Sequence, residues 1–296
     1  MTNILVVIVT YNALKWIGRC LRSVERSSLP ADVLLIDNGS TDGTLPLVRT
    51  DFPGTRIIET GENLGFGAAN NIGLRIALDE GYGFAYLLNQ DAWLQKDTLE
   101  KLVAAHRPEW GILSPMQMDA HGRRDKRFDK KCGKYVDALR GGYHSAGEVV
   151  EVPFVMAAHW LVSRRAIGTV GGFSPAFRQY GEDDNWIDRL HWHGLHCGVV
   201  PAAHAVHDRS GRRLPRADRM RLKCVAAVVK LSDPKRSWRW VRIRETLELA
   251  AMGVKNFSVI PWRFIPELRR RWPELLEYRE QSKRTGAFLP ERNPHF

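Results

Sequence analysis

The first 115 residues alternate between short apolar runs and segments with helical spacing, and this alternation restricts the fold more than any other feature. The apolar runs predict strands at 4–10, 32–38, 55–60, 84–89 and 111–115. The segments between them predict helices at 14–27, from about Asp42, at 66–80 and at 97–106. Strands that alternate with helices build sheets that are covered on both faces. The sequence therefore predicts an α/β fold with a mostly parallel central sheet.

Three of the apolar runs end abruptly in polar residues. The polar stretches are Thr10-Tyr11-Asn12, Asp37-Asn38-Gly39 and Asn89-Gln90-Asp91. In doubly wound sheets, ligands bind beyond the carboxyl ends of the strands. We therefore expect these three stretches to meet at one site.

Two of the loops have both a structural and a functional interpretation. In "LLIDNGSTDGT" (34–44), Asp37 is suited to accept a hydrogen bond from a nucleotide base or a ribose hydroxyl, or to hold a turn before the next helix. In "ENLGFGAANNIG" (62–73), the glycines of a helix start can let the backbone approach phosphate. The spacing of these glycines is not G-x-G-x-x-G, so a Rossmann-type dinucleotide site is disfavoured.

An acidic triplet opens the helix predicted from Glu182. Glu182, Asp183 and Asp184 are consecutive, and neighbours on a helix diverge by about 100°, so the three cannot all serve one site. One interpretation is stabilisation by the helix dipole. The other is a general base whose pKa is raised by the neighbouring negative charges.

Two histidines, His204 and His207, follow an apolar run in "AAHAVHDRSG" (202–211). A histidine in such a place is more often structural than a ligand. Together with oxygen-rich loops, however, one histidine can help to hold Mg²⁺ or Mn²⁺, and Mn²⁺ accepts imidazole more readily.

The positive charge of the chain is confined to its last third. The net charge is +11, yet residues 1–208 carry 22 Lys and Arg against 24 Asp and Glu (−2), whereas residues 209–296 carry 22 against 9 (+13). This asymmetry suggests an anionic partner, either nucleic acid or a membrane surface. Four scattered cysteines fit a reducing cytosol, and no run is long enough for a membrane span. The apolar start has neither a basic n-region nor a small-residue cleavage site, so a buried strand is expected there rather than a secretory signal.

Two further segments have alternative interpretations. The charged stretch 121–135 is either a solvated loop or a mobile loop beside the active site. Residues 236–280 predict helices rich in Trp and Arg, in which Trp240, Ile243, Leu247 and Val254 share one face. This stripe is suited to dock on the preceding domain or to lie on anionic lipid, and the two interpretations are compatible.

Five motifs in order carry a resemblance to a known family. They are "VTYN" (9–12), "IDNGSTDGT" (36–44), "NLGFGAANNIG" (63–73), "LLNQDAWL" (87–94) and "YGEDDNWIDRLHWHG" (180–194). Over residues 3–210 the chain resembles the family 2 glycosyltransferases with the GT-A fold, and most of all their rhamnosyltransferase-type members. The resemblance implies a GT-A catalytic domain over 1–210, with a nucleotide-sugar-binding half (1–115) and an acceptor-binding half (116–210). Residues 211–296 would be a basic helical extension.

The resemblance also implies roles for individual residues. The nucleotide-sugar would be bound by Thr10, Tyr11, Asn12, Asp37, Asn63, Gly65, Phe66, Gly67, Asn70, Asn89 and Gln90. Asn89-Gln90-Asp91 stands where the family has Asp-x-Asp, so Asp91 would bind the metal, Mg²⁺ or Mn²⁺, and His207 would complete its shell. Asp183 matches the general base and Glu182 its acceptor-side neighbour, whereas Asn185 replaces a second acid that is often found there.

The implied reaction is an inverting, single-displacement transfer from a dTDP-, UDP- or GDP-linked sugar, with rhamnose suggested by the family type alone. The acceptor would be a glycan or a lipid-linked saccharide, and the enzyme would lie in the cytoplasm, peripherally on the inner face of the membrane. One alternative is a sugar nucleotidyltransferase, although no basic glycine-rich phosphate loop is present near the N-terminus. Another is a nucleic-acid-binding or anionic-surface-binding protein, but the tail has no recognisable nucleic-acid-binding motif, and no nucleic acid is expected.

Overall fold

A single sheet of nine strands forms the centre of the protein. The computed structural model describes residues 3–138, 147–209, 215–286 and 288–289. The strands are β1 (Ile4–Thr10), β2 (Asp32–Asp37), β3 (Arg56–Glu59), β4 (Phe84–Asn89), β5 (Ala92–Leu94), β6 (Trp110–Met118), β7 (Val150–Glu151), β8 (His159–Ser163) and β9 (His196–His207). Their order across the sheet is β3-β2-β1-β4-β8-β6-β9-β5, and β7 pairs with β9 outside this path.

The first four strands are parallel, as the sequence predicts. β1 lies between β2 and β4, with Thr10 opposite Asp37 and Val9 opposite Asn89, so the three polar strand ends meet at one edge. β8 is inserted antiparallel between β4 and β6, which makes the complete sheet mixed. All five residues of β8 are buried, and such a strand is suited to the interior of a sheet.

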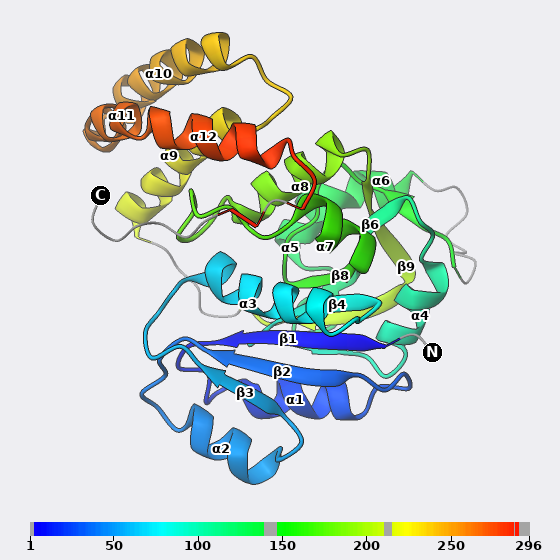
Figure 1. Ribbon diagram of the computed structural model, residues 1–296. Coiled ribbons are helices and arrows are strands. Elements are labelled where there is room, and N and C mark those ends of the chain that lie inside the picture. The colour runs from blue at the N-terminus through cyan, green and yellow to red at the C-terminus, as the bar shows by residue number, and fades with distance from the viewer. Residues whose placement is uncertain (1–2, 139–146, 210–214, 287, 290–296) are drawn as a thin grey trace.

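Helices cover both faces of the sheet (Figure 1). The helices up to β9 are α1 (Ile17–Glu25), α2 (Thr44–Asp51), α3 (Phe66–Asp79), α4 (Thr98–Ala105), α5 (Lys126–Phe128), α6 (Lys134–Asp137), α7 (Arg164–Val170) and α8 (Glu182–Trp192), with a π-helix, η1 (Asp129–Gly133), between α5 and α6. Alternate residues of β1 enter two hydrophobic cores. α1, α2 and α4 pack in one core, and α3, α7 and α8 in the other.

Four helices at the C-terminal end form a third hydrophobic core. They are α9 (Arg216–Ser232), α10 (Trp238–Lys255), α11 (Ile260–Arg270) and α12 (Trp272–Ser282). Among the described residues before β9, Ala176 and Phe177 alone contribute buried side chains to this core. Figure 1 shows these helices gathered beyond α8, at the end of the molecule opposite β3.

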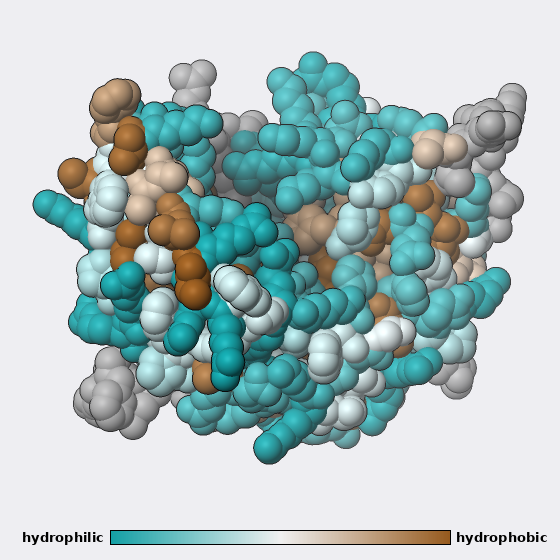
Figure 2. Space-filling model, turned by 90° about the horizontal axis from the view of Figure 1, so that it is seen from above, coloured by the Kyte–Doolittle hydropathy of each residue, from teal (hydrophilic) through white to brown (hydrophobic). Residues whose placement is uncertain are grey.

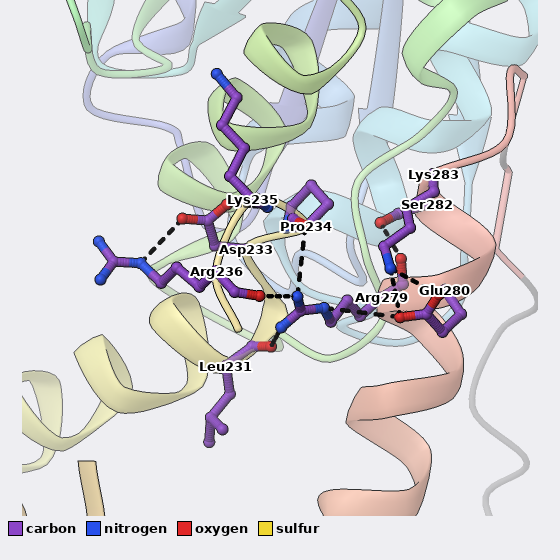
Figure 3. A network of polar contacts seen from close by, with 9 residues as sticks. All are labelled: Leu231, Asp233, Pro234, Lys235, Arg236, Arg279, Glu280, Ser282 and Lys283. Atoms are coloured by element: carbon purple, nitrogen blue, oxygen red, sulfur yellow. Dashed lines mark hydrogen bonds and ion pairs between the residues drawn. The ribbon is translucent and has the colours of Figure 1, made fainter. Parts of the chain in front are cut away.

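A buried arginine in α12 closes the end of α9 (Figure 3). Arg279 is 4% exposed and donates from its guanidinium to the carbonyl oxygens of Leu231, Pro234 and Arg236. The bond to Leu231 satisfies a carbonyl in the last turn of α9, and the other two bonds hold the connection between α9 and α10. Two further contacts join the C-terminal helices to the preceding part: Nε2 of His193 lies 3.1 Å from the Ser282 carbonyl, and Nη2 of Arg271 donates to the Ala176 carbonyl at 2.7 Å.

The face of α10 that packs against the protein is not the face that carries its apolar stripe. Its buried residues are Val241, Glu245, Leu249 and Gly253. The stripe residues Trp240, Ile243, Leu247 and Val254 are 74%, 50%, 65% and 66% exposed. Docking of this stripe on the preceding part of the chain, one of the two interpretations of the sequence, is therefore wrong. Among the described residues, no helix combines the length and the apolar character that crossing a membrane requires.

Candidate functional site

The carboxyl ends of β1 and β2 are joined through Asp37. Oδ1 of this carboxylate accepts hydrogen bonds from the hydroxyls of Thr10 (3.0 Å) and Ser40 (2.5 Å), and Oδ2 accepts from the backbone N–H groups of Gly39 (3.1 Å) and Ser40 (2.8 Å). A carboxylate has about four acceptor positions. Asp37 thus holds the turn after β2. The Asp37 carboxylate can contact a nucleotide base only if the hydroxyl of Thr10 or Ser40 gives up its hydrogen bond to it. Thr10 is fully buried, so it orients Asp37.

Gln90 joins the ends of β1 and β4 through its amide. Its Oε1 accepts from the backbone N–H of Tyr11 at 2.8 Å, and its Nε2 donates to the Tyr11 carbonyl at 3.3 Å. The ring of Tyr11 is left 48% exposed at the rim of the site, where it can stack on a base. Asn12, at φ 51°, accepts from the backbone N–H of Thr41 at 2.9 Å and so ties the β1 end to the turn after β2.

The glycine-rich loop is packed too closely to admit side chains. Gly65 has φ +87°, and a Cβ there would lie 2.5 Å from the carbonyl oxygen of Arg178. Asn63 accepts from the Gly65 N–H at 2.9 Å, and the buried Asn70 donates to the Phe66 carbonyl at 2.9 Å. Asn38 also donates to the Gly65 carbonyl at 3.3 Å, which joins this loop to the β2 end. The start of α3 is thus fixed beside Asp37.

A carboxylate and an imidazole meet beyond β4. Nε2 of His207 lies 3.3 Å from Oδ1 of Asp91, and the two side chains are 2% and 1% exposed. The antiparallel pairing of β5 with β9 produces this contact, because it sets Ala92 opposite His207. The sequence placed both histidines after a strand, but they lie inside β9, and His204 is exposed. Only His207 reaches Asp91.

Arg209 fixes the orientation of the imidazole of His207. Its Nε donates to Nδ1 of His207 at 3.1 Å, and it also forms an ion pair with Asp125 at 3.6 Å. Because Nδ1 accepts this bond, a neutral His207 carries its proton on Nε2, facing Asp91. Asp91 and His207 supply oxygen and nitrogen donors that suit Mg²⁺ or Mn²⁺, provided that the imidazole proton moves from Nε2 to Nδ1, which requires Arg209 to release Nδ1. Asp91 and His207 form only a pair, and in the described residues no group of three or more His, Cys, Asp or Glu forms a candidate metal cluster, here or elsewhere.

The acidic triplet lies at the start of α8, next to the end of β4. Asp183 accepts from the backbone N–H groups of Asp184 and Ala157. The carbonyl of the next residue, Ala158, accepts from the N–H of Asn89 at 3.2 Å. The segment before β8 therefore connects the carboxylate of Asp183 with the strand that leads to Asp91.

Burial and mutual repulsion shift the pKa values of these acids. Burial is the larger cause that raises the pKa of Glu182, and the negative charge of Asp183 is the next. Burial also raises the pKa of Asp183, with the negative charge of Asp184 as the second cause. Within the described structure, Oε2 of Glu182 is a buried atom without a hydrogen-bond partner. A Cβ on Gly67 would lie 3.8 Å from the Cβ of Glu182, so this carboxyl group sits by the start of α3.

The structure brings together most of the residues that the sequence singles out. The ends of β1, β2 and β4, the glycine-rich loop, Asp91 with His207, and the start of α8 are joined by the contacts above. The sequence does not identify Arg209, Asp125 and Ala157 as parts of this site. Arg209 lies only two residues after His207, but nothing in "VHDRS" indicates that it binds the imidazole. Asp125 and Ala157 come from distant segments.

Comparisons with known proteins agree with this geometry. Residues 5–168 match the model of the family described as Glycosyl transferase family 2. The N-acetylglucosaminyl-diphospho-decaprenol L-rhamnosyltransferase of Mycobacterium tuberculosis (strain ATCC 25618 / H37Rv) is 30% identical over 313 residues, which cover 94% of this chain and 100% of that protein. The dTDP-rhamnosyl transferase RfbF of Shigella flexneri is 26% identical over 219 residues, which cover 71% of each chain.

Solved structures share the fold at lower identity. The S. aureus protein TarS, residues 1–349, superposes with a TM-score of 0.59 at 16% identity, covering 95% of this chain and 80% of that one. The mannosyltransferase PcManGT from Pyrobaculum calidifontis, in complex with GDP-Man and Mn²⁺, gives a TM-score of 0.54 at 18% identity, with 94% of this chain and 85% of that one covered. These similarities support the GT-A fold that the motifs predict.

Proposed function

Since the chain belongs to glycosyl transferase family 2, we propose that it transfers rhamnose from a nucleoside diphosphate sugar to a lipid-linked saccharide, with inversion at the anomeric carbon. The observation that carries this proposal is the position of Asp183. Its carboxylate is held against the segment that also binds the end of β4, close to the proposed donor site. A base so placed can serve an acceptor hydroxyl that faces the donor sugar.

The proposed reaction is one displacement. The acceptor hydroxyl attacks C1 of the donor sugar from the face opposite the nucleotide, and Asp183 takes the hydroxyl proton. The new C1–oxygen bond forms as the bond from C1 to the diphosphate breaks, and the nucleoside diphosphate leaves with the electron pair. Glu182, as the acceptor-side neighbour, hydrogen-bonds the incoming sugar. Asp37, Tyr11, Asn12, Gln90, Asn89 and the 63–70 loop bind the nucleotide-sugar or fix the strand ends that bind it.

Asp91 and His207 are the residues that would hold a divalent metal, Mg²⁺ or Mn²⁺. Their donor atoms and their 3.3 Å separation support this assignment. The structural relative PcManGT carries Mn²⁺ with GDP-Man, which also favours a divalent ion here. A bound ion would neutralise charge on the leaving diphosphate.

The names of the relatives support the substrate assignment. One is a dTDP-rhamnosyl transferase, and another acts on N-acetylglucosaminyl-diphospho-decaprenol. The test is a screen of dTDP-rhamnose, a UDP-sugar and a GDP-sugar with an N-acetylglucosaminyl-diphosphoprenyl acceptor, with Mg²⁺, Mn²⁺ or a chelator. Mass spectrometry should detect a rhamnosylated product that depends on the metal, and NMR should give an anomeric configuration opposite to that of the donor. Product without inversion, or no product with any donor, would contradict the proposal.

The proposed enzyme has a catalytic domain of residues 1–210 and a C-terminal helical unit of residues 211–296. The surface of the C-terminal helices favours the proposal that this unit attaches the enzyme to an anionic membrane. Figure 2 shows hydrophobic residues gathered over the C-terminal helices. This surface contains the apolar stripe of α10, and Phe257, Val259 and Trp262 extend it. Its exposed members are Trp240, Ile243, Leu247, Val254, Phe257, Val259 and Trp262. Exposed Arg239, Arg244, Lys255 and Arg263 accompany them on α10 and α11. Apolar side chains with basic neighbours favour the interface of an anionic bilayer, which would place a cytoplasmic enzyme on the inner face of the membrane.

A further inference from the structure

The charged segment that follows β6 is anchored by one face and presents lysines on the other. Its helices α5, η1 and α6 bury Phe128, Cys132 and Val136, which recur at every fourth position and enter the same core as α8. Five cations of the segment are exposed: Lys126, Arg127, Lys130, Lys131 and Lys134. We call these five residues the basic face.

The acidic residues of the same segment are engaged elsewhere. Asp129 and Asp137 both pair with Arg124, at 3.2 Å and 2.7 Å. Asp125 accepts from the backbone N–H groups of Arg127 and Phe128 and pairs with Arg209. In the part of the chain that the structure describes, no close ion pair neutralises any member of the basic face. Its positive charge is therefore available to an external anion.

The basic face borders the acidic triplet. The Sγ of Cys132 donates to the Phe154 carbonyl at 3.3 Å, and the ammonium of Lys131 lies 4.8 Å from the centre of the Phe154 ring. Phe154 belongs to the segment whose Ala157 contacts Asp183. The charge of Lys131 also acts on Asp184, whose pKa it lowers against the larger effect of burial. Lys131 thus lies near the proposed base and its acceptor-side neighbour, and the other cations belong to the same short helical segment.

We propose that the basic face binds the diphosphate of the acceptor substrate. The inference rests on the proposed function, because it needs a sugar acceptor whose hydroxyl faces Asp183. In a sugar linked to diphosphate, the anionic group lies one sugar ring away from such a hydroxyl. Carboxylates at the start of α8 would repel that group, and the adjacent lysines offset the repulsion. Flexible ammonium groups are suited to phosphate oxygens that shift as the substrate docks.

The test compares two acceptors that carry the same sugar, with enzyme assayed in detergent so that no bilayer is present. One acceptor is N-acetylglucosaminyl diphosphate with a short prenyl chain, and the other is a neutral octyl glycoside of the same sugar. The variant replaces three members of the basic face by glutamine (K126Q/K130Q/K134Q) and keeps Lys131, whose charge acts on Asp184. Loss of three exposed charge contacts should raise KM for the diphosphate acceptor and so lower its kcat/KM roughly tenfold. The kcat/KM for the neutral glycoside should not change.

A matched triple variant, R26Q/K96Q/K223Q, removes three exposed cations outside this segment and should behave like the unmodified protein. Equal changes for both acceptors, or no change for the diphosphate acceptor, would overturn the basic-face proposal while the proposed function stands. Failure of the unmodified protein to use either acceptor would overturn both. Thermal unfolding of each variant identifies any loss that arises from misfolding.

Discussion

Nε2 of His207 lies 3.3 Å from Oδ1 of Asp91, and both side chains are almost completely buried. A buried carboxylate and a buried imidazole beyond the end of a central strand supply the donor atoms that the proposed divalent ion would need. The two preceding residues, Asn89 and Gln90, are amides, so Asp91 carries the one carboxylate of this stretch.

Replacing Asp91 by alanine should therefore remove metal-dependent transfer. Metal stabilisation of developing charge contributes several kcal/mol, so we expect a fall of at least a hundredfold in kcat with Mg²⁺ or Mn²⁺. Asn89→Asp is the matched control, and it should be tolerated because an amide and a carboxylate can both accept from a ribose hydroxyl. Retention of metal-dependent activity in Asp91→Ala would show that the metal is held elsewhere.

The raised pKa of Asp183 should set the acid limb of the pH–rate profile. The base acts as a carboxylate, so kcat/KM falls as the pH drops through a pKa that burial and Asp184 raise to about 7. Asp188 has a pKa that burial likewise raises to about 7, but it has no role in the proposed reaction. The profile of Asp188→Asn should keep the acid limb, and an unchanged rate down to pH 5 in the unmodified protein would contradict the base assignment.

Asp188 should also affect stability in a pH-dependent way. Its native pKa of about 7 exceeds the ordinary Asp value of about 3.9, so the native state binds more protons between these limits and stability falls as the pH rises through this window. Asp188→Asn removes the cost, and urea unfolding should show a gain in stability at pH 8 that vanishes near pH 3. A variant that is equally stabilised at both pH values would argue against burial as the cause of the shift.

Gly65→Ala should destabilise the protein by about 1–3 kcal/mol and raise the donor KM, because it combines a positive φ with a clash against the Arg178 carbonyl. Gly61→Ala is the control for backbone strain alone, since Gly61 has φ +75° and no atom within 4 Å of the added Cβ. Urea unfolding of the two variants separates the contributions. Equal destabilisation would mean that the loop moves away from Arg178 at no cost.

Leu247→Ser, within the apolar stripe, should weaken flotation with vesicles of anionic lipid. Burial of a leucine side chain contributes about 1.5–3 kcal/mol, so the partition coefficient should fall roughly tenfold or more. Leu14→Ser changes a leucine that is 46% exposed outside the C-terminal helices, and it should float like the unmodified protein. If Leu247→Ser instead abolishes self-association and leaves flotation intact, the stripe is a contact between copies of the chain.

The sequence predicts the parallel strands and their helices because local apolar spacing determines both. It does not predict the antiparallel insertion of β8 or the pairing of β5 with β9, which depend on contacts between distant segments. The approach of His207 to Asp91 follows from that pairing. Similarly, the spacing in α10 identifies an apolar face but not the face that packs, and the buried face includes Glu245 paired with Lys230 at 2.8 Å.

The role of Asp37 was open for a different physical reason. The same Asp-Asn-Gly-Ser sequence suits both a turn and a nucleotide site, and the structure fills the acceptor positions of Asp37 with groups of the turn and of β1. In contrast, the meeting of the three polar strand ends at one edge follows the rule for doubly wound sheets, and five short motifs were sufficient to indicate the family.

The most direct test of the account is the turnover of Asp183→Asn, measured together with donor binding. Asparagine keeps the size of the side chain but cannot take the acceptor proton, so kcat should fall by roughly 10²–10⁴. Calorimetric titration with the nucleotide-sugar should give an affinity close to that of the unmodified protein. Full turnover in Asp183→Asn, with an inverted product, would contradict the assignment of Asp183 as the base.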